Sequence, residues 1–129
     1  MNVPLSQRRL HSPYLFFRNE WQKIWPDIEF RHCLFHYVKA LLRQVAVHGM
    51  KKQFMNLKNA KLRKMVRMAL ALPFCPPRRI PKAMEFITDI SNELDNHAQH
   101  RFGKKFVKYL DKVWINGKYP IKTWNYWCK

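Results

Sequence analysis

Cys33 and His36 are the residues of this chain whose types and spacing most readily suggest chemistry. A cysteine and a histidine three positions apart can present a thiolate and an imidazole to the same side of a metal ion. A structural zinc ion takes four ligands, and the sequence holds no second pair of this kind. We therefore interpret the pair as structural, with zinc binding and a Cys–His nucleophile as alternatives. The further metal ligands on offer are scattered: His32, His48, Cys75 and Cys128.

Three acidic residues recur at every fourth position, at Glu85, Asp89 and Glu93. On a helix this spacing places the carboxylates on one face. Two of them could hold a divalent cation, but an acidic stripe opposite an apolar one is typical of a solvated surface. We interpret the stripe as solvated. Exposed ion pairs are a further option, with the basic residues of the next helix, Lys104, Lys105 and Lys108.

Basic residues dominate the composition. There are 25 Lys and Arg against 8 Asp and Glu, which gives a formal net charge of +17. No acid lies between Glu29 and Glu85, an interval rich in Lys and Arg. Such a charge opposes compaction unless a polyanion neutralises it, so nucleic acid is the favoured partner, ahead of a solvated surface and an anionic membrane. The residues that we expect to contact phosphates are Lys51, Lys52, Lys58, Lys61, Arg63, Lys64, Arg67, Arg78 and Arg79.

This basic pattern contains no arrangement typical of base-edge reading, so we predict non-specific binding. If about six of the charges contact phosphates, the log–log slope of affinity against salt should be about −5. Aromatic residues near the C-terminus offer a second type of contact, because they could stack on bases. They could equally belong to a core. These residues are Trp124, Tyr126 and Trp127.

The 129 residues suffice for one domain or for part of a larger one, and the hydrophobic fraction of 47% can build a core. Three widely spaced cysteines without a preceding signal peptide suggest a reduced, intracellular setting. No apolar run reaches the roughly 18 residues of a membrane span, so we expect no membrane partner. A short mitochondrial presequence is an alternative interpretation of the N-terminus.

The elements that must position these residues are predicted to be mainly helical. Residues 1–13 look irregular, and the apolar spacing over 14–25 predicts an amphipathic helix that Pro26 stops. Alternation over 27–33 predicts a short strand, for which the sequence offers no convincing partner. The best helix covers 34–48, with Gly49 as its C-cap. Its predicted inner face consists of Phe35, Val38, Leu41, Leu42 and Val45.

Further along the chain, helices are predicted over 51–57, 59–72, 80–96 and 101–114. A proline-rich connector separates the second of these from the third, which carries Pro81 in its first turn. The tail over 118–129 is expected to be loop-like. The fold class is therefore mainly α, a bundle of four to six helices with at most one short strand around one aromatic-rich core.

Several segments of the chain, in the right order, resemble the Mutator-like element (MULE) transposases. The stretch Arg31–His36 after Trp25-Pro26-Asp27 is similar to the strand and helix of that family, which carry "Cys-x-Phe-His". The resemblance covers about residues 20–127. Its other segments are Val38–Arg43, Leu62–Pro73, Pro76-Pro77, Ile80–Ala83, Phe106–Leu110, Val113–Ile115 and Trp124-Asn125.

This resemblance implies an RNase H-like parent enzyme, in which two Asp and one Glu hold Mg²⁺ or Mn²⁺ for phosphoryl transfer. It divides the chain into an irregular segment 1–13 and a partial transposase domain 14–129. Within that domain, 14–33 would end the RNase H-like part, 34–117 would be the helical insertion and 118–129 the tail. Neither of the two catalytic Asp residues that the resemblance implies is present. Ser12 stands near the position of the second Asp, and the catalytic Glu would follow the tail. Cys33 and His36 are the family-signature residues.

We therefore expect a truncated or degenerate MULE-type fragment, located in the nucleus. It should have no catalytic residue, no metal, no cofactor and no enzyme activity of its own. Its expected partners are DNA, bound non-specifically, and an intact transposase. The alternatives from other classes are a small RNA-binding structural protein, such as a ribosomal or mitochondrial ribosomal component, and a zinc-stabilised interaction module.

Overall fold

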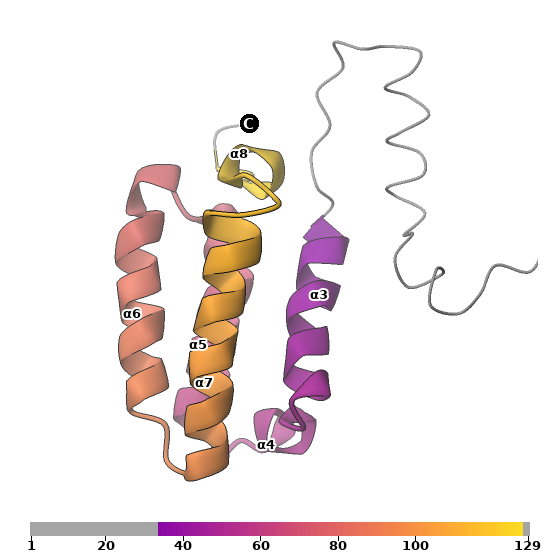
Figure 1. Ribbon diagram of the computed structural model, residues 1–129, viewed down its shortest axis with the longest axis vertical. Helices are drawn as coiled ribbons and strands as arrows, with labels where there is room; N and C mark the ends of the chain where they lie inside the picture. The colour runs from indigo at the N-terminus through magenta and orange to yellow at the C-terminus, as the bar shows by residue number, and fades with distance from the viewer. Residues whose placement is uncertain (1–33, 128–129) are drawn as a thin grey trace, which may run out of the picture.

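A computed structural model of the chain describes residues 34–127. Four long helices lie side by side with alternating direction, as Figure 1 shows. A short helix joins the first two at one end of the bundle, and another lies at the opposite end. The α-helices are α3 (Leu34–Val47), α4 (Lys51–Met55), α5 (Ala60–Ala71), α6 (Ile80–Asn92), α7 (His97–Tyr109) and α8 (Ile121–Trp124).

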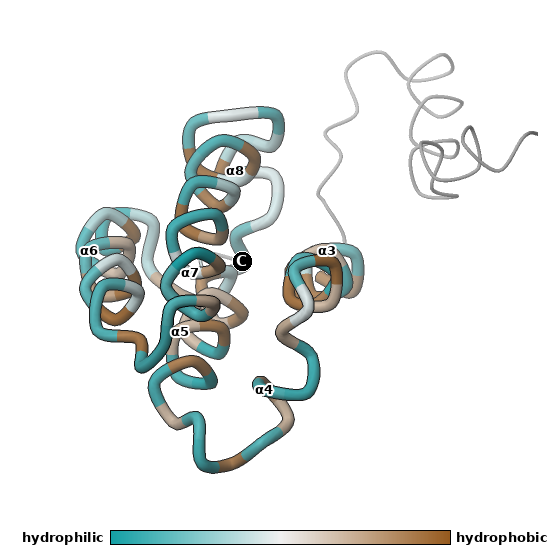
Figure 2. The backbone as a smooth tube through the Cα atoms, turned by 60° about the horizontal axis from the view of Figure 1, so that its bottom comes forward, coloured by the Kyte–Doolittle hydropathy of each residue, from teal (hydrophilic) through white to brown (hydrophobic). Residues whose placement is uncertain are grey.

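This arrangement confirms the expected fold class, since the described residues are mainly helical and include no strand. The hydrophobic and hydrophilic residues alternate along the helices (Figure 2). None of the described helices combines the length and the apolar character needed to cross a membrane. The predicted helix over 14–25, the predicted strand over 27–33 and Cys33 lie outside the described residues, as does Cys128.

The end of α3 follows directly from the glycine in the sequence. Gly49 has φ +71°, and its N–H donates to Ala46 O at 3.0 Å. The N–H of Met50 donates to Val45 O at 2.9 Å, which completes a Schellman motif. Gly49 is therefore the C-cap, as its position predicted.

The inner face of α3 differs from the predicted one. Tyr37, Leu41 and Val45 are buried, whereas Phe35 is 63% exposed and Leu42 is 38% exposed. The prediction for Phe35 and Leu42 was wrong because a second apolar stripe, running through Tyr37, lies on the neighbouring face of the same helix. Contacts with distant residues decide which of the two stripes is buried.

The connector between α5 and α6 contains two 3₁₀ turns, η1 (Leu72–Phe74) and η2 (Pro77–Arg79). Helix α6 then begins at Ile80 with Pro81 in its first turn, as predicted, but it ends at Asn92 rather than at residue 96. Helix α7 begins earlier than the predicted residue 101, because the side chain of Asn96 caps it by accepting a hydrogen bond from Gln99 N at 2.9 Å.

A π-helix, η3 (Leu110–Ile115), continues α7. The N–H of Asn116 donates to Asp111 O at 2.7 Å, the five-residue spacing that defines this helix type. The expectation that the following tail is only loop-like was wrong, because residues 121–124 form α8 and Trp124 is fully buried. The indole N–H of Trp124 donates to Trp114 O at 2.9 Å, which attaches the tail to η3.

The centre of the core is aromatic. The ring of Tyr37 lies edge-on to Trp114 at a centroid distance of 4.9 Å and stacks on Trp124 at 5.3 Å. The hydroxyl of Tyr37 donates to Ala69 O at 2.6 Å, and burial raises the pKa of this tyrosine above its ordinary value. These contacts join α3, α5, η3 and α8, so the core unites segments from both ends of the described chain.

Candidate nucleic-acid interface

Helix α5 presents a basic stripe to solvent. Leu62, Met65, Val66 and Ala69 fill the buried side of the helix. On the opposite side Lys64 and Arg67 are exposed, between the small residues Ala60 and Ala71. These four positions recur at intervals of three and four residues, which places them on one face. Lys64 and Arg67, two of the residues expected to contact phosphates, are therefore accessible to a ligand.

A shallow groove of about 440 Å³ runs along this face of α5. We call it the α5 groove. Apart from its three basic side chains, the lining of the groove is small or apolar and carries no negative charge. The groove is lined by Leu57, Ala60, Arg63, Lys64, Arg67, Met68 and Ala71.

Arg63 is held in place by the preceding helix. One of its guanidinium nitrogens donates to Phe54 O at 2.6 Å, and the guanidinium lies 5.6 Å from the centre of the Phe54 ring. The carbonyl of Phe54 belongs to the last turn of α4, so Arg63 fixes the α4–α5 corner. Its charge stays at the edge of the α5 groove, but its geometry serves packing as much as ligand binding.

Lys61 points to a different side of α5. Its ammonium group lies 3.8 Å from an Asp95 carboxylate oxygen and 3.3 Å from Glu93 O, both in the turn between α6 and α7. The structure thus separates Lys61 from Lys64 and Arg67, although the sequence placed all three in one predicted interface. Its positive charge is already partly compensated.

The other predicted phosphate contacts lie at the two ends of α5. Lys51 and Lys52 are exposed on α4, and Lys58 is exposed in the turn that leads into α5. At the opposite end, Arg78 and Arg79 are exposed in η2. The nine predicted residues are therefore spread along α5 and its two ends, and three of them, Arg63, Lys64 and Arg67, line the α5 groove.

The acids are confined to the later part of the described chain. From Leu34 to Met84 there is no Asp or Glu, so α3, α4, α5 and the connector carry only positive formal charges. The described carboxylates all follow Met84 and lie in α6, in η3 or in the α6–α7 turn. No Asp or Glu lines the α5 groove itself, and the carboxylate of Asp95 lies against Lys61 on a different side of α5.

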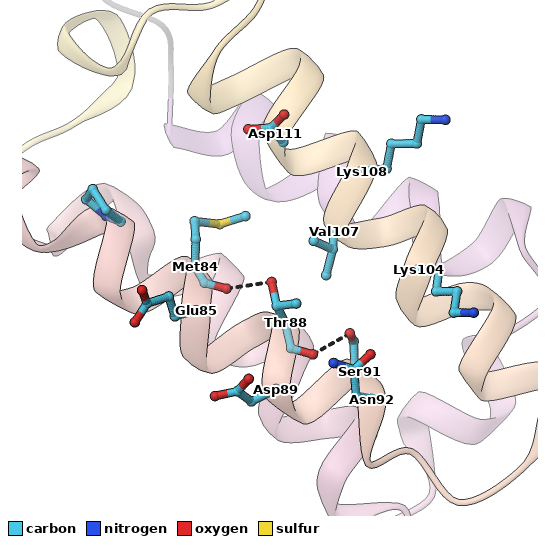
Figure 3. Close-up of a pocket in the computed structure, with 11 residues that line it drawn as sticks. Met84, Glu85, Thr88, Asp89, Ser91, Asn92, Lys104, Val107, Lys108 and Asp111 are labelled. Atoms are coloured by element: carbon cyan, nitrogen blue, oxygen red, sulfur yellow. Dashed lines mark hydrogen bonds between the residues drawn. The ribbon is translucent and has the colours of Figure 1, made fainter.

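A second groove of about 590 Å³ lies between α6 and α7 (Figure 3). Glu85 and Asp89 lie on its α6 side and Lys104 and Lys108 on its α7 side. Figure 3 shows the two acids directed away from α7 and Lys108 directed away from α6. The ion pairs found among residues 34–127 are Lys61–Asp95 and Lys82–Glu85, so the optional pairing of the acidic stripe with α7 is not formed.

A row of basic residues runs along α7 and η3. From the sequence, three of its members were considered only as ion-pair partners of the acidic stripe, and the row as a whole was missed. Their spacing places them on one exposed face, and helical periodicity alone could have revealed the row. This row differs from the α5 groove, because Glu85 and Asp89 of α6 line the same groove as Lys104 and Lys108. The lining of the α5 groove is neutral or basic. The row consists of Arg101, Lys104, Lys105, Lys108 and Lys112, all exposed.

Potential metal ligands do not converge in the described part of the chain. Within residues 34–127, no group of three or more His, Cys, Asp or Glu is placed to hold an ion. Glu93 follows the last residue of α6, so the predicted acidic stripe is shorter than the sequence suggested. His36 is half-buried in the first turn of α3, whereas its predicted partner Cys33 is outside the described region.

Comparisons with protein-family models, with curated proteins and with solved structures find no match to this chain.

Proposed function

We propose that the chain binds DNA non-specifically through the basic surface around the α5 groove, and that it is a catalytically inactive piece of a MULE-type transposase. The observation that carries the binding proposal is the α5 groove. There Lys64 and Arg67 are exposed side by side, while no carboxylate occurs in the described chain before Glu85.

Binding would work through phosphate neutralisation. A duplex carries a dense row of phosphates and condensed counterions, and each Lys or Arg that replaces a counterion releases it to solvent. Basic residues near both ends of α5, such as Lys58 and Arg78, extend the surface beyond the groove. Contacts of this kind set position and affinity but read no sequence, which is why the proposal is non-specific binding.

The family part of the proposal is supported by the ordered motifs of the sequence. The helical character of residues 34–117 suits the helical insertion that the resemblance implies. The proposed location is the nucleus, and the proposed protein partner is an intact transposase. Without the Asp and Glu residues that hold Mg²⁺ or Mn²⁺ in the parent family, the chain should not cut DNA. Metal-dependent strand cleavage by the pure protein would contradict this part.

The first prediction concerns salt. Binding of wild-type protein to a mixed-sequence duplex should weaken with NaCl at a log–log slope of about −5. In the double variant Lys64→Gln/Arg67→Gln the magnitude of that slope should decrease by about 1 for each phosphate that is no longer neutralised. Fluorescence anisotropy titrations across a series of NaCl concentrations measure both slopes. Two exposed substitutions of this kind should not disturb the core.

The matched control is Lys104→Gln/Lys105→Gln on α7, which removes the same charge from an exposed helix face that lies beside acids. This control should keep a slope closer to that of wild type. Equal effects of the two double variants would show that only net charge matters, and would remove the α5 groove from the proposal. A wild-type affinity that is independent of salt would contradict phosphate binding as a whole.

The same titration with duplex RNA tests the RNA-binding alternative. The proposal expects DNA to bind at least as tightly as RNA of the same length, since phosphate contacts alone do not favour A-form geometry. A strong preference for RNA would instead support a ribosomal or similar role.

A further inference from the structure

Exposed aromatic side chains gather at the end of the bundle where the α5–α6 connector meets the C-terminal segment. Phe74 in η1 is 54% exposed, and Trp127 is 52% exposed. Tyr126, next to Trp127 in sequence, has its ring 6.3 Å from that of Phe74 at an interplanar angle of 31°. About half of the side chain of Phe74 and of Trp127 therefore remains available for contact with a ligand.

Backbone and side-chain hydrogen bonds hold the two segments together. The N–H of Tyr126 donates to Pro73 O at 2.7 Å. The buried amide of Asn125 donates to Cys75 O at 2.8 Å and accepts from the N–H of Trp127 at 3.0 Å. Because Asn125 bonds to both segments, the aromatic residues on either side are held in a fixed relation, and binding there requires little ordering.

Positive charge lies close in sequence to Phe74. Arg78 and Arg79 are exposed on the same connector as Phe74, and no Asp or Glu occurs between Leu34 and Met84. Aromatic rings beside basic residues are the combination by which proteins hold single strands, since bases stack on the rings and phosphates meet the charges. A duplex offers no free base faces, so it cannot use such rings in this way.

A second copy of the chain is a weaker fit to the same surface. Its net charge has the same sign, at +17, and each connector carries two arginines, so two such faces repel each other. Single-stranded nucleic acid supplies both the opposite charge and the flat apolar rings. Charge complementarity therefore selects it as the occupant.

We propose that Phe74 and Trp127 form a stacking site for unpaired bases of single-stranded DNA, flanked by phosphate contacts from Arg78 and Arg79. This inference rests on the proposed function, since it takes DNA as the partner, and it adds a preference for single strands. The α5 groove contacts backbone in either form of DNA. The stacking site, defined by these four residues, acts only on exposed bases.

The second prediction tests the stacking site with an oligothymidylate and a duplex of the same length, both measured by fluorescence anisotropy. Phe74→Ala/Trp127→Ala should weaken oligothymidylate binding by about tenfold or more and leave duplex binding unchanged. Oligothymidylate should also quench the fluorescence of Trp127. This quenching is obtained as the signal of wild type minus that of Trp127→Phe. Trp127→Phe should itself retain most of the affinity, because a ring remains.

Phe86→Ala is the matched control, because Phe86 on α6 is 52% exposed and belongs to neither segment. It should bind both ligands as wild type does, and circular dichroism should show that all variants fold. The stacking site is overturned if Phe74→Ala/Trp127→Ala binds oligothymidylate as tightly as wild type does, or if it loses equal affinity for oligothymidylate and duplex. If the salt slope still depends on Lys64 and Arg67 in that case, the α5 groove proposal stands. The stacking site is also overturned if wild type is a dimer and Phe74→Ala/Trp127→Ala is a monomer, because the rings would then serve self-association. Wild-type protein that binds neither ligand overturns both proposals.

Discussion

At the scale of single residues, Tyr37 compensates for a proline in another helix. In a regular helix the carbonyl of Ala69 would accept the N–H of residue 73, but that residue is Pro73, which has no N–H. The Ala69 carbonyl instead accepts two other hydrogen bonds. One comes from the N–H of Leu72, three residues on, and the other from the hydroxyl of Tyr37 at 2.6 Å. The Leu-Pro end of α5 and the tyrosine of α3 are therefore physically coupled.

The third prediction follows from this coupling. Tyr37→Phe keeps the ring between Trp114 and Trp124 and removes only the hydroxyl. At neutral pH the free energy of unfolding should fall by about 1–2 kcal/mol, because a buried carbonyl loses a donor. Urea denaturation measures the change. The loss should be smaller in a Pro73→Ala background, where a backbone N–H is restored; an equal loss in both backgrounds would contradict the coupling.

The same variant has a distinct pH dependence. Burial raises the pKa of Tyr37 in the folded state, so above about pH 10 the unfolded chain releases a proton that the folded chain keeps. Stability contributed by this hydroxyl is complete below that pH and decreases by about 1.4 kcal/mol for each pH unit above it. The wild-type and Tyr37→Phe curves should therefore converge near pH 11. Parallel curves up to that pH would show that Tyr37 ionises freely in the folded protein.

At the scale of elements, local patterns predicted helices better than they predicted which faces are buried. Gly49 and Pro81 act on their own backbone, so their helix boundaries could be read from the sequence. The outward Phe35 could not, since α3 has two apolar stripes and Trp114 and Trp124, far along the chain, decide between them. The basic face of α5 followed from periodicity, but the partners of Lys61 and Arg63 depend on tertiary contacts. The proposed stacking site at Phe74 depends on hydrogen bonds from Asn125, which no local pattern indicates.

The approach of α6 to α7 depends on a glycine, which gives the fourth prediction. A Cβ atom at Gly103 would lie 2.9 Å from Leu94 Cδ1 and 3.0 Å from Ser91 Cβ, closer than such atoms pack. Gly103→Ala gains about 1 kcal/mol in helix propensity, but overpacking costs typically 1–3 kcal/mol. We expect a net loss on the order of 1 kcal/mol, seen as a Tm lower by a few degrees.

An exposed position of the same helix supplies the comparison for this variant. Lys105→Ala has no close neighbour to displace and should change the free energy of unfolding by less than about 0.5 kcal/mol. A Gly103→Ala protein more stable than wild type would mean that α6 and α7 can separate at little cost. The contact across Gly103 would then not fix their spacing.

At the scale of the whole molecule, the charge that suits DNA binding opposes folding. The formal net charge is +17, and the described ion pairs, Lys61–Asp95 and Lys82–Glu85, are both exposed. Such pairs are worth about 0.2–1 kcal/mol each. Repulsion among the many cations acts over longer distances and is not offset locally, so it should exceed the attraction at low ionic strength.

The fifth prediction is that salt stabilises the free protein while it weakens DNA binding. Between about 10 mM and 150 mM NaCl the Debye length decreases from about 30 Å to about 8 Å, and α7 alone, with 13 residues, is about 20 Å long. Repulsion across the bundle is therefore screened, and Tm measured by circular dichroism should rise over this range. Duplex DNA added at the lower salt concentration should raise Tm as well, because a ligand that binds only the folded state stabilises it. A Tm that falls with NaCl would show that ion pairs contribute more to stability than repulsion removes.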